Sequence, residues 1–286
     1  MNENKLSRAH LKQVIAPFVF GVSFSHTEGE VQAAPGFYIR FNGGLTLDDT
    51  CRIAADIGFK GYDLIGPAYW PTLRKYGLTP TMACLGAAGN PNRGIGAKEA
   101  HAELQASTCE ALQQCGEFGV PNIVVMTGPR AGMAPEEGAD NSVEFLNRVK
   151  AQAEDLNVTL CIEILNAKDH ADYLFDHAKW GFEVVRRVNS PRVKILYDIY
   201  HAQVQDGDVV RTMRENIEWI GHIHTAGNPG RKQLDDEQEL NYPYIAREIA
   251  ALKFAGYVGH EYMPTADADA VECLKKAYAM FDLEIG

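Results

Sequence analysis

The sequence lacks several patterns that would assign it to a well-defined class. Its 286 residues contain no Cys-x-x-Cys pair, no Gly-x-Gly-x-x-Gly turn and no Gly-Lys-Ser/Thr ending of a phosphate-binding loop. A zinc ribbon, a dinucleotide-binding turn and a P-loop are therefore not indicated. No apolar run approaches the roughly 20 residues that a membrane-spanning helix needs. The sequence thus predicts a protein without a membrane segment.

Positive charge is also scarce. The chain has 27 basic against 38 acidic side chains, a formal net charge of −11. This balance argues against nucleic acid as a partner, because phosphate backbones are bound by clustered Lys and Arg. The six cysteines (Cys51, Cys84, Cys109, Cys115, Cys161 and Cys273) are scattered. This spread is typical of reduced, mostly buried thiols, so we expect a cytoplasmic protein.

One local pattern repeats along the chain: a short apolar or β-branched run, a Gly, Pro or Asn turn, and then a stretch with helical spacing. The predicted strands cover residues 14–23, 60–65, 79–85, 122–127, 158–165, 193–200, 219–225 and 257–262. The predicted helices cover residues 45–58, 71–76, 97–116, 142–156, 171–188, 209–216, 243–254 and 266–281. A polar, Gly-rich insertion separates the first strand from the first helix and holds a further strand near residues 36–41.

Eight strands alternating with eight helices predict an α/β fold, a (β/α)₈ TIM barrel. The continuous apolar character of the strands fits a buried parallel sheet. A doubly wound sheet would show the same alternation, but no dinucleotide-binding turn follows any strand. No linker rich in Pro or Ser divides the chain, so we predict a single domain over residues 1–286 with an N-terminal extension over residues 1–13.

Each of the last four predicted strands has an ionisable residue after an apolar run. These residues are Glu163, Asp198, His224 and Glu261. In a barrel of this kind, polar residues at the carboxyl ends of the strands line the active site. A buried carboxylate must be paired, protonated or bound to metal, and three of them in one place repel one another. A divalent cation would remove this conflict, and three oxygen donors with one imidazole suit Mg²⁺ or Mn²⁺, or otherwise Co²⁺ or Zn²⁺.

Around these residues the sequence resembles the hydroxypyruvate isomerase family, part of the xylose-isomerase-like TIM barrel superfamily of sugar isomerases and epimerases. The resemblance rests on residues 163–166 (Glu-Ile-Leu-Asn), 197–201 (Tyr-Asp-Ile-Tyr-His), 229–231 (Pro-Gly-Arg), 239–242 (Glu-Leu-Asn-Tyr) and 256–262 (Gly-Tyr-Val-Gly-His-Glu-Tyr). It extends from about Leu45 to the C-terminus.

The resemblance implies a metal-dependent isomerase that acts on a small keto acid or sugar. Metal would be bound by Glu163, Asp198, His224 and Glu261, and the two glutamates would also form the acid/base pair. Arg231 and His201 would face the substrate, although His201 could instead hydrogen-bond a metal ligand. From its own chemistry, Lys168 is a further candidate for binding a substrate carboxylate.

Several histidines, a Gly-rich segment and two aromatic residues lead to further expectations. His222 and His260 are expected on the opposite faces of their strands from His224 and Glu261, packed against helices. His170 and His177 are expected to be structural or exposed. The Gly-rich segment 86–96 is expected to be a plain loop, with a phosphate cradle or a lid as alternatives. Tyr69 and Trp70 either wall the substrate site or pack in the core.

Several functions remain open at this stage. The resemblance departs at His224, where hydroxypyruvate isomerases often carry Gln and ketose 3-epimerases carry His. A ketose 3-epimerase or a keto-inositol dehydratase would use the same residues. A sensor that binds a metal and a sugar acid without turnover is a non-enzyme alternative. An abasic-site endonuclease would need a basic groove, which the net charge of −11 opposes. Homo-oligomers are common among such barrels, but the sequence does not decide the oligomeric state.

Overall fold

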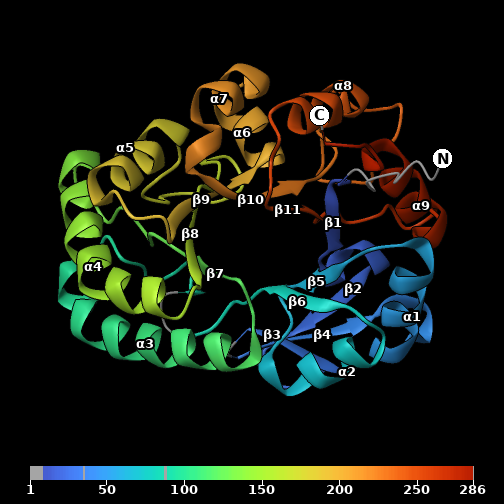
Figure 1. Ribbon diagram of the computed structural model, residues 1–286, viewed down its shortest axis with the longest axis horizontal. Coiled ribbons are helices and arrows are strands. Elements are labelled where there is room, and N and C mark those ends of the chain that lie inside the picture. Colours follow the sequence, from blue (N-terminus) through green and yellow to red (C-terminus); the bar gives the residue numbers. More distant parts are fainter. Residues whose placement is uncertain (1–8, 35, 87–88, 286) are drawn as a thin grey trace, which may run out of the picture.

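The strands of the structure fall into two sheets (Figure 1). This computed structural model describes residues 9–34, 36–86 and 89–285. The larger sheet contains β1 (Lys12–Ile15), β5 (Gly61–Asp63), β6 (Thr79–Met82), β7 (Asn122–Val125), β8 (Thr159–Glu163), β9 (Val193–Asp198), β10 (Ile220–Thr225) and β11 (Tyr257–His260). The smaller sheet contains β2 (Val22–Ser25), β3 (Val31–Ala34) and β4 (Phe37–Phe41).

The eight strands of the larger sheet form a barrel. Their order is β6-β5-β1-β11-β10-β9-β8-β7, and every pairing between neighbours is parallel. A parallel bridge between Ala83 and Ile123 joins the two ends of this order, so the barrel is nearly closed. The fold is therefore the predicted single-domain (β/α)₈ barrel.

The helices form a ring outside the barrel (Figure 1). They are α1 (Leu47–Ile57), α2 (Trp70–Lys75), α3 (His101–Phe118), α4 (Pro135–Asp155), α5 (Ala178–Val188), α6 (Ile199–Gln205), α7 (Val209–Asn216), α8 (Tyr242–Ala251) and α9 (Ala270–Phe281). α1 illustrates how they begin: Thr46 and Asp49 form a capping box that satisfies the first free N–H groups. None of the helices in the described ranges is both long and apolar enough to cross a membrane.

Several predicted boundaries differ from the structure. The helix predicted over residues 142–156 is α4, which begins seven residues earlier at Pro135, because proline is favoured in the first turn of a helix. Two further differences also have identifiable reasons. The strand predicted over residues 193–200 ends at Asp198, because the Asp198 carboxylate accepts hydrogen bonds from the backbone N–H groups of Tyr200 and His201 and begins α6. The helix predicted over residues 171–188 begins only at Ala178. The preceding segment instead turns back over the barrel, where the Tyr173 hydroxyl donates to the Glu163 carbonyl at 3.0 Å.

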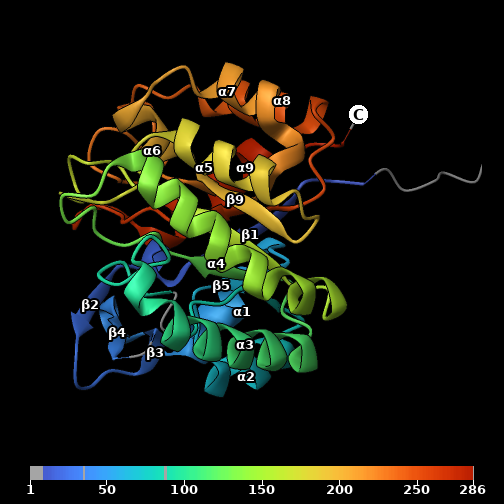
Figure 2. The same cartoon turned by 90° about the vertical axis from the view of Figure 1, so that its left-hand side faces the viewer.

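The insertion after the first strand is the antiparallel sheet of order β2-β4-β3, which includes the extra strand predicted near residues 36–41. It projects from one end of the barrel (Figure 2). The first predicted strand, residues 14–23, is in fact β1, a short 3₁₀ turn over Pro17–Phe20, and β2. Of the predicted N-terminal extension, residues 1–8 lie outside the described residues, whereas Lys12 and Gln13 already belong to β1.

The cysteines are free thiols, and Cys51, Cys115 and Cys161 are buried. Burial raises the pKa of the Cys51 and Cys115 thiols to about 12. At pH 8 only about one molecule in 10⁴ would carry either thiolate, the reactive form. Iodoacetamide is therefore expected to label the partly exposed Cys109 and Cys273 first, as measured by mass spectrometry. Urea-denatured protein, in which every thiol reacts, is the control; rapid native labelling of Cys51 or Cys115 would contradict the burial.

Candidate active site

The four ionisable residues predicted at the strand ends come together at one end of the barrel. Glu163 ends β8, Asp198 ends β9, His224 lies near the end of β10 and Glu261 directly follows β11. One ligand atom from each lies within 4.8 Å of those of the other three. All four side chains are buried. The convergence follows from the parallel sheet, because its strands all end at the same rim.

The three buried carboxylates of this cluster repel one another, and burial disfavours their charged forms. Burial and the neighbouring Glu261 carboxylate raise the pKa of Glu163 to about 8. Burial also raises the pKa of Asp198. Glu261 differs: although burial opposes ionisation, Arg231 and His224 lower its pKa to about 2. Without a cation the site therefore keeps a proton on Glu163 at neutral pH and relies on Arg231 to balance Glu261.

The donor set fits a divalent cation. Three carboxylates and one imidazole are a ligand combination used for Mn²⁺, Mg²⁺ and related ions. The Nδ1 atom of His224 is buried, lies 3.2 Å from Glu261 Oε2 and has no well-directed hydrogen-bond partner in the described part of the chain. Although burial opposes the charge, Glu261 and Asp63 raise the pKa of His224, so a cation bound at Nδ1 would displace a proton from the ring.

Arg231 lies in the loop after β10 and reaches into the same cluster. Its Nη2 lies 2.5 Å from Glu261 Oε2 and 3.3 Å from Asp198 Oδ2. Burial acts against its charge, but Glu261 and Asp198 raise the pKa of the guanidinium above its usual value. Arg231 also lines the main cavity, as expected for a residue that faces the substrate.

The other two predicted substrate residues lie elsewhere. His201 is buried beside Asp198, with Nε2 3.6 Å from Asp198 Oδ2 and Nδ1 2.7 Å from the Asn166 side-chain amide. It is not among the residues that line the main cavity, a position that favours its alternative role beside a metal ligand. Lys168 is exposed in the loop after β8 and does not line the cavity either. His170, expected to be structural or exposed, does line it.

The cavity in front of the cluster has a volume of about 800 Å³. Its wall includes Phe18 and Phe37 from the region of the small sheet, and Leu64, Val124, Met126 and Leu165 from the barrel. Residues of the Gly-rich segment 86–96 line it as well. Trp70 instead packs in the core, where its indole N–H donates to the Ile65 carbonyl, so the packing alternative holds for Trp70. The sequence predicted the polar side of this cavity and missed the apolar side.

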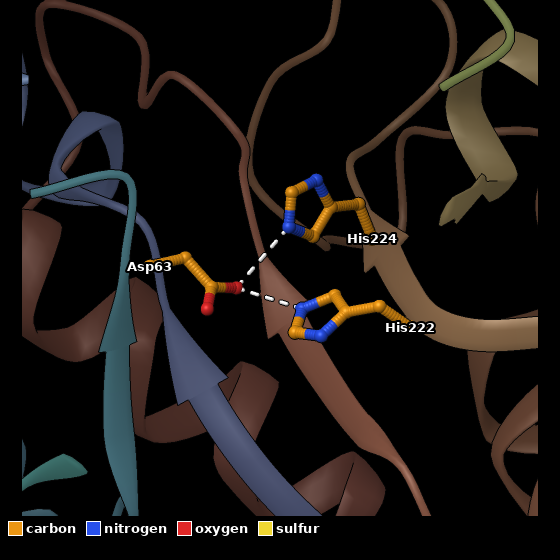
Figure 3. A group of neighbouring side chains, drawn as sticks. All are labelled: Asp63, His222 and His224. Carbon is orange, nitrogen blue, oxygen red and sulfur yellow. Dashed lines mark hydrogen bonds and ion pairs between the residues drawn. The ribbon is translucent and has the colours of Figure 1, made fainter. Parts of the chain in front are cut away.

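The expectation for His222 was wrong. Residues two apart on a strand share a face, so His222 points the same way as His224, and their rings lie 5.0 Å apart. Both Nε2 atoms bond to Asp63 Oδ2 at the end of β5 (Figure 3). The spacing of His222 and His224 was the signal that could have shown this. The expectation for His260 is confirmed: its ring packs against Phe281 of α9.

Comparison with known proteins supports the same fold. A sequence model described as the xylose isomerase-like TIM barrel matches residues 51–277. The 2-oxo-tetronate isomerase of Cupriavidus necator is 30% identical over 252 residues, which cover 83% of this chain and 94% of that protein. The hydroxypyruvate isomerase of Escherichia coli is 28% identical over 169 residues, covering 59% of this chain and 65% of that protein.

Solved structures agree in fold. A crystal structure from Brucella melitensis, described as an AP endonuclease of family 2, has a TM-score of 0.76 at 21% identity and covers 96% of this chain and 100% of that chain. A D-psicose 3-epimerase crystallised with D-fructose has a TM-score of 0.70 at 17% identity, covering 94% and 97%. At these identities the likeness shows the fold alone. With the family match over most of the barrel and four ionisable residues at its strand ends, the chain belongs to the xylose isomerase-like TIM barrel family.

Proposed function

We propose that this protein is a metal-dependent isomerase that interconverts a small 2-oxo or hydroxy-keto acid and its isomer by moving a proton between adjacent carbons. The observation that carries the proposal is the cluster of Glu163, Asp198, His224 and Glu261, in which the two glutamates also line one cavity. Sequence relatives named 2-oxo-tetronate isomerase and hydroxypyruvate isomerase support this substrate class.

The two glutamates have positions suited to proton transfer. Glu163 comes from β8 and Glu261 from the end of β11, strands that are not neighbours in the barrel, and both line the cavity. One carboxylate removes the proton from the carbon next to the substrate carbonyl, and a carboxylate returns it to the former carbonyl carbon. The proton of the neighbouring hydroxyl passes to the former carbonyl oxygen, which completes the exchange of the two groups. Arg231 keeps Glu261 ionised in the absence of substrate. The apolar wall lowers the local dielectric constant and so strengthens these electrostatic interactions.

The proposal assigns Glu163, Asp198, His224 and Glu261 as ligands of a divalent cation, with Mn²⁺ or Mg²⁺ favoured over Co²⁺ and Zn²⁺. When bound, such a cation would supply Lewis-acid polarisation of the substrate oxygens. The chain itself supplies the acid/base groups, the guanidinium of Arg231 and the shape of the cavity. His201, whose Nε2 lies 3.6 Å from Asp198 Oδ2, would hold the Asp198 carboxylate in place.

A ketose 3-epimerase is the second candidate, and two observations favour it. His224 stands where ketose 3-epimerases carry His. The cavity volume of about 800 Å³ lies in the upper part of the range for small-molecule sites, roughly 300 to 1,000 Å³, and exceeds what a four-carbon acid fills. A keto-inositol dehydratase would use the same groups. The net charge of −11 continues to argue against an abasic-site endonuclease.

A deuterium-exchange assay tests the proposed reaction. Purified protein with added Mn²⁺ is incubated in D₂O with a panel of 2-oxo acids, 3-hydroxy acids and ketoses of three to six carbons. We expect NMR to detect deuterium at the carbon next to the carbonyl, together with the isomer, for at least one small acid. Exchange with ketoses alone and inversion at C3 would select the epimerase. Binding of a sugar acid with neither exchange nor formation of an isomer would contradict both enzymes and select the non-enzymatic sensor.

A further inference from the structure

Asp63 ends β5 and contacts two histidines from a strand that is not its neighbour. Its Oδ2 lies 2.8 Å from His222 Nε2 and 3.1 Å from His224 Nε2 (Figure 3). In the barrel order, β1 and β11 separate β5 from β10. The contact therefore crosses the barrel interior, and all three side chains are fully buried.

Asp63 is held firmly in this position. Its other carboxylate oxygen, Oδ1, accepts a hydrogen bond of 2.6 Å from the Thr81 hydroxyl on β6. A carboxylate whose oxygens already lie at hydrogen-bond distance from the Thr81 hydroxyl and from two imidazole nitrogens acts as the acceptor, so both imidazoles donate through Nε2–H.

The backbone of β11 leaves room for this arrangement at Gly259. A Cβ atom at that position would lie 2.5 Å from Asp63 Oδ2 and 2.8 Å from His224 Cδ2. Both distances are well inside van der Waals contact, so a side chain at this position would displace either Asp63 or His224. Three features therefore maintain the position of the Asp63 carboxylate against the His224 ring. They are the missing side chain at Gly259, the Thr81 hydroxyl and the second donor, His222.

This geometry decides which nitrogen of His224 faces the carboxylate cluster. Because Nε2–H points to Asp63, Nδ1 is the atom directed at the cluster, 3.2 Å from Glu261 Oε2. We propose that Asp63 is a positioning residue that, together with His222, orients the His224 ring so that Nδ1 is available to the divalent cation. The inference rests on the proposed function, since it concerns the same cation, but it assigns roles to Asp63 and His222 that the acid/base chemistry does not require. Carboxylate partners of this kind fix the tautomer and orientation of metal-ligating histidines.

The same three residues could instead be considered as a second cation site, since their ligand atoms also lie within 4.8 Å of one another. Their hydrogen bonds argue against this. Asp63 uses both oxygens on proton donors, and His224 would have to offer both ring nitrogens to cations at once.

Titration of the metal-free protein with Mn²⁺, followed by calorimetry, tests the inference without using turnover. Wild-type protein is expected to bind one ion per chain. Asp63→Ala is expected to raise the Mn²⁺ Kd by roughly 10- to 100-fold, the usual effect of losing such a partner. Asp63→Asn keeps the size and one accepting oxygen, so a smaller rise is expected. This second variant keeps the test decisive if Asp63→Ala does not fold.

Gln13→Ala is the matched control. Gln13 is another buried polar side chain bonded to a strand histidine, His260, and its other side-chain hydrogen bond in the described part of the chain goes to the Tyr278 carbonyl. The Gln13→Ala variant should lower the Tm, as we also expect for Asp63→Ala. It should leave the Kd for Mn²⁺ unchanged within error. A purely structural role for Asp63 would make the two variants behave alike.

A second readout does not involve a cation. In ¹⁵N-histidine-labelled protein, the Nε2–H protons of His222 and His224 should be protected from solvent exchange in the wild type and lose this protection in Asp63→Ala. Unchanged Kd values in both Asp63 variants would overturn the inference while leaving the proposed function standing. Two ions per wild-type chain would also overturn it, in favour of a second cation site. No Mn²⁺ binding by the wild type would overturn the metal role itself.

Discussion

Replacing Glu261 with Gln is expected to lower kcat by roughly 10²- to 10⁴-fold, the usual contribution of a general acid or base. The amide keeps the size of the side chain but cannot accept the substrate proton. Glu163→Gln should have an effect of similar size, because the proton must also reach the second carbon. Steady-state kinetics on the substrate found by deuterium exchange, at saturating Mn²⁺, measures both.

The two variants should differ in stability, which separates lost catalysis from lost folding. Glu163 has a pKa raised to about 8 and is largely protonated at pH 7 in metal-free protein, so Gln replaces a neutral group by a neutral group. The Tm of metal-free Glu163→Gln should therefore stay close to that of the wild type. Glu261→Gln removes the anion closest to Arg231, so it should lower the Tm of the metal-free protein.

Glu248→Gln is the control for both variants. It makes the same chemical change on α8, where Glu248 pairs with Arg214 away from the cavity. Its kcat should match that of the wild type. Retention of wild-type turnover by Glu261→Gln would remove Glu261 from the acid/base role.

Removal of divalent cations is expected to abolish activity. The three buried carboxylates repel one another in the absence of a cation, and the substrate oxygens lose their polarising partner. After dialysis against EDTA, turnover should fall to background and return on addition of Mn²⁺ or Mg²⁺. Full activity in the dialysed protein would contradict the metal assignment.

The cation should also stabilise the fold. A ligand that binds only the native state contributes about 2.7 kcal/mol when present at 100 times its Kd. We therefore expect Mn²⁺ to raise the Tm of the dialysed protein by several degrees, as measured by calorimetry. In Asp198→Asn, which weakens one proposed ligand, this rise should shrink. An equal rise in both proteins would show that the ion binds elsewhere.

Much of the fold could be predicted because its signals are local. Buried parallel strands appear in the sequence as short apolar runs, and the helices between them have a helical apolar spacing. An ionisable residue at the end of such a run is conspicuous, which is why Glu163, Asp198, His224 and Glu261 stood out. Their convergence then follows from the geometry of any parallel barrel.

Other features depended on contacts between distant parts of the chain. The start of α5 at Ala178 could not be predicted, because the residues before it pack back over β7 and β8 instead of continuing the helix. The apolar wall at Phe18 and Phe37 depends on how the small sheet lies against the barrel mouth. His201 and Lys168 were both predicted as candidate substrate residues, and only the structure places His201 beside Asp198 and Lys168 in an exposed loop, with neither lining the cavity.

The sequence by itself determined the barrel and the four residues at its rim, because strand period, burial and the direction of parallel strands are properties of short segments. Only the tertiary structure decided that Arg231 neutralises Glu261 and that Asp63 bonds to His224. The Arg231–Glu261 pair joins segments that follow two neighbouring strands, β10 and β11, whereas the Asp63–His224 bond crosses the barrel interior from β5 to β10. Both contacts join residues far apart in the sequence, and the second also depends on the absence of a side chain at Gly259.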